Sequence, residues 1–156
     1  MQNHKTWKAG ILLIGICTLF TSNAIAQNSI KDLDKLESEY LKSIRADFAD
    51  KCWQNTIGGH FDKGQSKPDA IAAASQEAFT GWIEGKSIYK IHPVAHEVKA
   101  DLFDNRSYIL ERNDGALLAL EMGFRNRLGE WYIYLLHAGP DDKMVRKVLN
   151  MPAYEE

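Results

Sequence analysis

The chain has 156 residues, of which 45% are hydrophobic and 26% are charged, and its formal net charge is −2. This length and composition suit one domain with a core of its own. The balance is acidic and the sequence has no clustered run of Lys and Arg, which argues against nucleic acid as a partner.

The N-terminus has the three parts of a secretory signal peptide. Lys5 and Lys8 form a positive segment, the apolar run AGILLIGICTLF follows over residues 9–20, and AIA at residues 24–26 is a small-x-small cleavage site. The apolar run is shorter than the ~20 residues that cross a membrane. We therefore expect a signal peptide over residues 1–26, an exported protein in the periplasm or outside the cell, and no membrane span after cleavage.

Cleavage would leave residues 27–156 as a single domain with 17 basic and 21 acidic residues, a formal charge of −4. Cys17 would be lost with the signal peptide, so that Cys52 could form no internal disulfide. Cys52 follows the apolar face of a helix and precedes Trp53, which favours a buried, inert thiol over a reactive nucleophile or an intermolecular bridge.

The first predicted element of the mature chain is an amphipathic helix from Ser29 to about Lys51, with Ser29 and Asp32 as its capping box. Its apolar residues recur at intervals of three and four, the spacing of one helix face. These residues are Leu33, Leu36, Tyr40, Leu41, Ile44 and Phe48.

A loop rich in Gly and polar residues is expected over residues 54–67, and a second helix after it. Pro68 opens this helix and Gly85 ends it. Its expected inner face carries Ile71, Ala74, Ala78, Phe79 and Trp82.

After Gly85 the period of the apolar residues changes from near four to two, which predicts an antiparallel meander. A last short helix is expected over residues 141–150, after Pro140. The fold class is therefore α+β: two N-terminal helices packed on a curved antiparallel sheet of about four strands, with a short C-terminal helix. The expected strands cover residues 94–102, 107–113, 116–124 and 131–137.

Two amphipathic helices, the strand IYKIHPVAHEVKAD (residues 88–101), a hairpin and the closing strand GEWYIYLLH (residues 129–137) resemble the nuclear transport factor 2-like superfamily. The likeness covers roughly the whole mature chain and is one of architecture, with a Gly-x-Trp pattern in the final strand. Members of that superfamily, which have a cystatin-like α+β fold, are typically cones around an apolar pocket and frequently dimers. They include isomerases, dehydratases, polyketide cyclases and non-catalytic binding domains. The resemblance implies the fold and the pocket, and it assigns no catalytic residue.

Tight turns fix which residues of a hairpin face each other. We expect turns at Asp104–Asn105, Asp114–Gly115 and Leu128–Gly129, and the last would pair Leu120 with His137. All three turns place one set of mainly apolar residues on a single, inner face of the sheet. This set is Val94, Val98, Leu102, Ile109, Leu118, Leu120, Met122, Phe124, Trp131, Ile133 and Leu135.

The opposite face would mix charges with tyrosines and leucines. Tyr108, Tyr132 and Tyr134 are the candidate interface residues on it, because aromatic side chains are enriched where proteins meet. Two interpretations stay open for this face, a homodimer formed through the sheet and a solvated surface.

His92 and His96 stand four residues apart, with Glu97 beside the second. In a strand, residues four apart are separated by about 13 Å. Two imidazole nitrogens on one zinc ion must each lie about 2 Å from the metal. We therefore expect no metal at this pair and no cofactor in the protein.

His96 and Glu111 are the candidate acid–base pair, since the expected registers make them diagonal neighbours on the inner face. A carboxylate beside an imidazole fixes the tautomer and suits proton transfer. His137 could point into the same space. The alternative is that these residues are solvated and structural at the end of the sheet. The residues expected to line a ligand pocket are Trp82, His96, Glu111, Met122, Trp131 and His137.

We expect an exported domain that binds a small apolar or amphipathic molecule in a cone-shaped pocket. Two other classes stay open: a cofactor-independent isomerase, dehydratase or hydrolase using His96 and Glu111, and a protein-binding module or inhibitor acting through the tyrosine-bearing face. A deep pocket containing His96 and Glu111 would favour the enzyme. A filled core with exposed Tyr132 and Tyr134 would favour the binding module.

Overall fold

The computed structural model describes residues 28–46, 56–62, 64 and 68–152. The predicted signal peptide and the predicted thiol Cys52 lie outside these residues, as do positions 47–51 of the first predicted helix.

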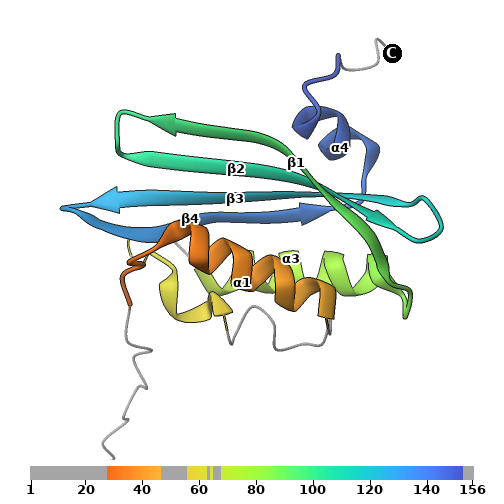
Figure 1. The fold of residues 1–156 in the computed structure, drawn as a ribbon, viewed down its shortest axis with the longest axis horizontal. Helices are drawn as coiled ribbons and strands as arrows, with labels where there is room; N and C mark the ends of the chain where they lie inside the picture. Colours follow the sequence, from red (N-terminus) through yellow and green to blue (C-terminus); the bar gives the residue numbers. More distant parts are fainter. Residues whose placement is uncertain (1–27, 47–55, 63, 65–67, 153–156) are drawn as a thin grey trace, which may run out of the picture.

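Four antiparallel strands form one sheet in the order β1-β2-β3-β4, so β1 and β4 are its edges. α1 and α3 lie on one face of the curved sheet and α4 lies on the other (Figure 1). The predicted α+β architecture is confirmed. The elements are α1 (Leu33–Ala46), the 3₁₀ turn η1 (Gly58–His60), α3 (Pro68–Ile83), β1 (Ile88–Lys99), β2 (Phe103–Arg112), β3 (Leu117–Arg127), β4 (Glu130–Gly139) and α4 (Asp142–Val148).

The N-terminal cap of α1 differs from the predicted capping box. The backbone N–H of Lys35 donates to Oδ1 of Asp32 at 2.9 Å, so Asp32 itself caps the helix. Ser29 lies one residue before Ile30, which is bridged to Trp131 at the start of β4. α1 therefore begins about three residues later than the sequence pattern predicts.

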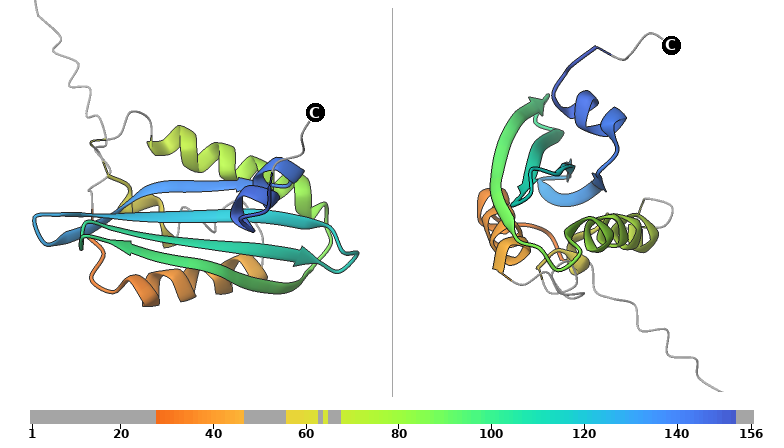
Figure 2. Two further views of the ribbon diagram at one scale, coloured as in Figure 1. Left: turned by 90° about the horizontal axis from the view of Figure 1, so that it is seen from above. Right: turned by 90° about the vertical axis from the view of Figure 1, so that its right-hand side faces the viewer.

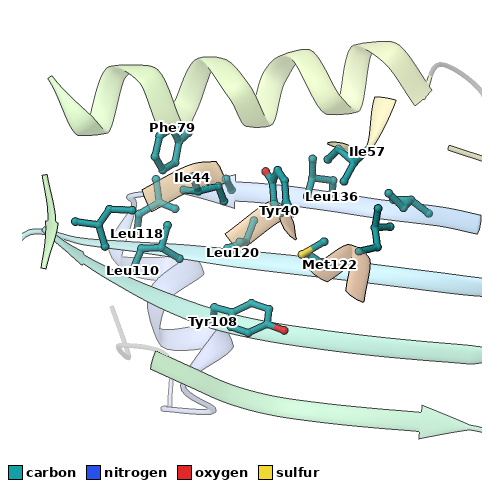
Figure 3. Close-up of a cluster of buried hydrophobic side chains, with 14 of the residues drawn as sticks. Tyr40, Ile44, Ile57, Phe79, Tyr108, Leu110, Leu118, Leu120, Met122 and Leu136 are labelled. Carbon is teal, nitrogen blue, oxygen red and sulfur yellow. The ribbon is translucent and has the colours of Figure 1, made fainter. Parts of the chain in front are cut away.

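α1 lies under the β1 side of the sheet and α3 under the β4 side (Figure 2). The core lies between these helices and the sheet (Figure 3). Ile57 and Phe61 of the η1 segment complete it, with Phe61 bridged to Ile133. We call this face of the sheet the helix face; its buried apolar residues are Ile88, Tyr108, Leu110, Leu118, Leu120, Met122, Phe124, Ile133, Leu136 and Ala138.

The opposite face, which we call the α4 face, has a smaller apolar cluster. Ile109 of β2 and Ala119 of β3 are covered by three apolar residues of α4. These are Met144, Val145 and Val148.

The first hairpin turns earlier than predicted. Ala100 and Asp101 have positive φ angles of 52° and 53°, and the N–H of Leu102 donates to the carbonyl oxygen of Lys99 at 2.9 Å. Alanine adopts this left-handed region at a cost of roughly 1–2 kcal/mol, whereas aspartate tolerates it, so no propensity rule selects the turn at Ala100. The predicted turn at Asp104–Asn105 is wrong, and both residues lie in β2.

The second hairpin has a loop one residue longer than predicted. The N–H of Arg112 donates to the carbonyl oxygen of Ala116 at 2.8 Å, and Leu110 rather than Glu111 lies opposite Leu118. A slip of one residue moves every side chain of a strand to the other face. Tyr108, Leu110 and Arg112 therefore lie on the helix face, and Ile109 lies on the α4 face, the reverse of the prediction.

The third hairpin turns at Leu128 and Gly129 as predicted, and Phe124 faces Ile133. An irregularity follows between Gly123 and Phe124. A Cβ atom at Gly123 would lie 2.6 Å from the ring of Tyr134, so only glycine fits beside it.

Beyond this bulge the register of β3 and β4 is shifted by one residue. Leu120 faces Ala138, and His137 faces Glu121 on the α4 face. Of the predicted inner-face set, Leu118, Leu120, Met122, Phe124 and Ile133 are buried there, whereas Val94, Val98 and Leu102 are exposed.

Candidate functional site

The α4 face carries a histidine–glutamate pair on β1 and β2. His92 lies opposite Ile109 and Lys90 lies opposite Glu111, which makes His92 and Glu111 neighbours on one face. Nε2 of His92 is 2.9 Å from Oε2 of Glu111. The two side chains are 39% and 31% exposed, so solvent or a ligand can reach both.

This pair lies in a hollow of about 620 Å³ between the β1 edge of the sheet and the end of α4. Apart from the pair, its lining is apolar. We call it the α4-face hollow; its residues are His92, Pro93, Val94, Ile109, Glu111, Leu117 and Leu149.

The hollow exists because α4 is too short to cover the whole face. Its seven residues pack over Ile109 and Ala119 and leave the β1 side uncovered. Val94, Leu117 and Leu149 around the hollow are therefore 36%, 37% and 38% exposed.

The sequence positions α4 through its N-terminus. The Asp141 carboxylate accepts a hydrogen bond from the N–H of Met144 at 2.9 Å, the usual role of an N-cap residue. A Cβ atom at Gly139 would lie 2.7 Å from the Met144 sulfur, so glycine allows the close approach. Nζ of Lys147 lies 2.9 Å from a carboxylate oxygen of Glu121 and holds the last turn on β3.

A second polar cluster lies on the helix face, around a buried arginine. Arg106 is 6% exposed, and its guanidinium donates to both carboxylate oxygens of Asp104 at 2.9 and 3.0 Å. Nη1 also contacts Glu37 and, at 2.8 Å, Asp34 of α1. The guanidinium carbon lies 5.6 Å from the ring centre of Phe124. One buried cation thus joins three carboxylates and ties the first turns of α1 to β2.

Tyr108 belongs to the same cluster. Its side chain is buried, and its hydroxyl donates to Glu37. Burial raises the pKa of Tyr108 to about 12, so the hydroxyl stays neutral and remains a donor across the physiological range.

His96 joins this cluster and not Glu111. Its Nε2 lies 3.0 Å from Oδ1 of Asp104, and the imidazole is half exposed on the helix face. Glu111 lies on the α4 face. The predicted His96–Glu111 pair is therefore wrong, because the first hairpin turns at residues 100–102 and carries β2 into a different register.

Two adjoining hollows of about 370 and 320 Å³ form a groove between α1 and β1. Glu37, Pro93 and Tyr108 line both. We call this the α1–β1 groove; it runs from Asp34, Arg106 and His96 at one end to Leu41, Lys42, Arg45 and Ile91 at the other.

The other predicted pocket residues are divided among the described parts of the molecule. Trp82 and Met122 are buried in the core, and Trp131 packs against the edge of it. His137 lies on the α4 face, with Nδ1 3.6 Å from a carboxylate oxygen of Glu121. These residues therefore do not line one pocket.

The candidate interface tyrosines are also separated. Tyr108 is in the core. Tyr132 and Tyr134 are half-buried, and the Tyr134 ring lies edge-on to Phe103, with 5.4 Å between the ring centres. The Tyr134 hydroxyl donates to Asn105. The registers place this aromatic pair on the α4 face, outside the cluster that α4 covers.

Sequence reasoning missed the arginine cluster. The alternation of Asp104, Arg106, Tyr108 and Leu110 carries the signal, because these residues share one face of β2 and Leu110 on that face is fully buried. Only the register of the second hairpin shows that this face is the inner one.

Among the residues that the structure describes, no group of three or more His, Cys, Asp and Glu side chains could hold a metal ion. In the same residues, no helix is long and apolar enough to span a membrane. No family model matches this chain, and no curated protein matches it either. Function must therefore be inferred from the geometry of the α4-face hollow and the α1–β1 groove.

Proposed function

We propose that the protein is an exported binding domain that holds a small, mainly apolar molecule in the α4-face hollow. The observation that carries this proposal is the hollow itself, with apolar walls around the single polar pair His92 and Glu111. Its volume of about 620 Å³ is in the range typical of small-molecule sites. Export is part of the proposal and rests on the signal-like N-terminus.

Covering the walls of the hollow would supply binding free energy. Full burial of a Val or Leu side chain contributes about 1.5–3 kcal/mol. Val94, Leu117 and Leu149 are each more than a third exposed, so a ligand that covers them would gain roughly 0.5–1 kcal/mol from each.

The polar pair determines the chemistry of the ligand. With Nε2 of His92 engaged by Glu111, the imidazole retains Nδ1 and the carboxylate retains lone pairs. A hydroxyl group can donate to the carboxylate or to Nδ1, which is an acceptor when Nε2–H donates to Glu111. The best-supported ligand class is therefore a compact apolar ring system with one hydroxyl group that donates a hydrogen bond.

2-Naphthol is a suitable probe for this site. We expect it to bind the purified chain in a calorimetric titration, and Leu117→Glu to weaken binding at least about tenfold by placing a charge among the apolar walls. Leu128→Glu is the matched control, because Leu128 is fully exposed at the β3–β4 turn. Equal affinity of wild type and Leu117→Glu would contradict the proposal.

A cofactor-independent enzyme is the second candidate, because the structure joins Glu111 to an imidazole at 2.9 Å in an apolar hollow. Such a pair could remove a proton from carbon next to a ketone. Exchange of the α-protons of 2-tetralone in deuterated water, followed by NMR, tests this activity. Catalysed exchange that is lost in Glu111→Gln would favour the enzyme, and exchange at the buffer rate would leave binding as the function.

A homodimer formed through the sheet stays a prediction. Tyr132, Tyr134 and Phe103 on the uncovered part of the α4 face are its best-supported contacts, since aromatic side chains dominate interface energetics. Analytical ultracentrifugation of wild type and Tyr134→Ala measures the dimer, and we expect the variant to dimerise more weakly. A dimer that is unaffected by this change would place the contact elsewhere.

A further inference from the structure

The two ends of the α1–β1 groove carry opposite charges. Asp34 and Glu37 stand at the end near the start of α1, and Lys42 and Arg45 stand at the other end. Neither Lys42 nor Arg45 forms an ion pair with any residue that the structure describes. Within the described part of the chain, the charge of the basic end is therefore not neutralised by an ion pair.

The acidic end is also incompletely neutralised. Asp34, Glu37 and Asp104 share the guanidinium of Arg106, and the His96 imidazole lies 3.0 Å from Asp104. Among the described residues, acidic side chains therefore outnumber basic ones at this end of the groove. Asp34 is 86% exposed at its side chain, so an ammonium group can approach it without disturbing the buried part of the cluster.

The middle of the groove is apolar. Leu41 of α1, Ile91 and Pro93 of β1 and the ring of Tyr108 separate the charged ends. The eight-residue step from Glu37 to Arg45 along α1 is about 12 Å, at 1.5 Å per residue. An extended chain advances about 3.3 Å per residue, so this distance fits about four residues.

We propose that the α1–β1 groove binds a short peptide of about four residues in extended form, with its free ammonium at Asp34 and Glu37 and its free carboxylate at Lys42 and Arg45. This proposal is independent of the α4-face hollow, which lies on the other face of the sheet. The apolar middle of the groove selects peptides with apolar side chains at the central positions.

The direction of the peptide follows from the fold. The start of α1 lies beside His96 near the end of β1, and the end of α1 lies beside Ile91. The peptide therefore runs antiparallel to β1. β1 is an edge strand of the sheet, and no described strand pairs with its outer side, where an added strand could form backbone hydrogen bonds. Pro93 has no N–H, which interrupts this pairing at one position and limits it to a short segment.

The tetrapeptide Gly-Leu-Val-Gly with free ends is the probe, used in calorimetric titrations of the full chain. Its N-acetylated and C-amidated forms each lack one terminal charge. We expect either modification to weaken binding about fivefold, the effect of an exposed ion pair worth up to about 1 kcal/mol.

The variants assign each end of the peptide to its end of the groove. In Lys42→Ala/Arg45→Ala, amidation should no longer matter while acetylation still does. In Asp34→Asn, the effect of acetylation should shrink while that of amidation stays. Lys35→Ala is the matched control, because Lys35 lies on α1 outside the groove and is 70% exposed; it should bind like wild type. Circular dichroism checks that every variant folds.

Three outcomes would overturn the proposal. The free peptide could fail to bind at millimolar concentration, the doubly blocked peptide could bind as tightly as the free one, or amidation could cost the same in Lys42→Ala/Arg45→Ala as in wild type. Asp34, Lys42 and Arg45 are exposed, and Asp34→Asn keeps an oxygen that can accept from Arg106, so we expect these variants to fold, as the circular dichroism checks.

Discussion

Replacement of Arg106 by methionine tests the buried cluster that organises the helix face. Methionine preserves much of the apolar volume and removes the charge. Asp104, whose side chain is 8% exposed, and Glu37, at 20%, would then lose the cation between them. Removing one partner of a buried ion pair typically costs 3–5 kcal/mol, and we expect a loss of about 4 kcal/mol in the free energy of unfolding.

Arg112→Met is the matched control. Arg112 lies on the same strand and the same face, and its guanidinium lies 5.6 Å from the centre of the Trp82 ring. Its carboxylate partners, Asp114 and Glu84, are exposed at 38% and 66% of their side chains, so that no buried carboxylate is left behind. We expect a loss of about 1–2 kcal/mol from the lost cation–π contact and hydrogen bonds.

Urea unfolding at pH 7, monitored by circular dichroism, gives both values. The triple variant Arg106→Met/Asp104→Asn/Glu37→Gln removes the stranded charges and should recover at least about half of the loss, because neutral groups are less costly to bury than charged ones. An Arg106→Met variant within about 1 kcal/mol of wild type, or a triple variant no more stable than the single one, would refute the reasoning.

The registers, the pKa of Tyr108 and the N-terminus give three further predictions. Leu120→Ala should lower the free energy of unfolding by about 2–5 kcal/mol, because Leu120 is 1% exposed. Glu121→Ala, on the other face, should lower it by about 1 kcal/mol or less. The reverse order in urea unfolding would mean that the two faces of the sheet are exchanged. Because the pKa of Tyr108 is raised by burial to about 12, its stabilising contribution is full below pH ~10 and lost between pH 10 and 12. Tyr108→Phe should therefore lose less stability than wild type over that window, and equal losses would contradict the assignment. Exported material should begin at Gln27 by intact mass, and retention of Met1 would show that no signal peptide is removed.

The fold class could be predicted because helices and strands leave different periods in the sequence. Phe79 and Trp82 recur at helical spacing, and the residues around Leu120 and Met122 alternate. These patterns depend on local geometry alone. The elements, their order and the α+β class can therefore be derived from the sequence.

The site could not be predicted to the same extent, because it depends on registers that single residues control. The turn at Ala100 and Asp101 uses positive φ at two non-glycine residues, and the bulge beside Gly123 depends on the place of the Tyr134 ring. Neither feature has a local sequence signal. The first separates His96 from its predicted partner Glu111, and the second moves His137 to the α4 face. The longer loop of the second hairpin moves Tyr108 into the core.

The central claim, that the α4-face hollow holds a small apolar molecule, is tested most directly by native mass spectrometry of the protein purified from exporting cells. We predict an additional organic mass on the wild type that is retained in Leu128→Glu and absent from Leu117→Glu. A bare chain in the wild type, or an additional mass that persists in Leu117→Glu, would contradict the account.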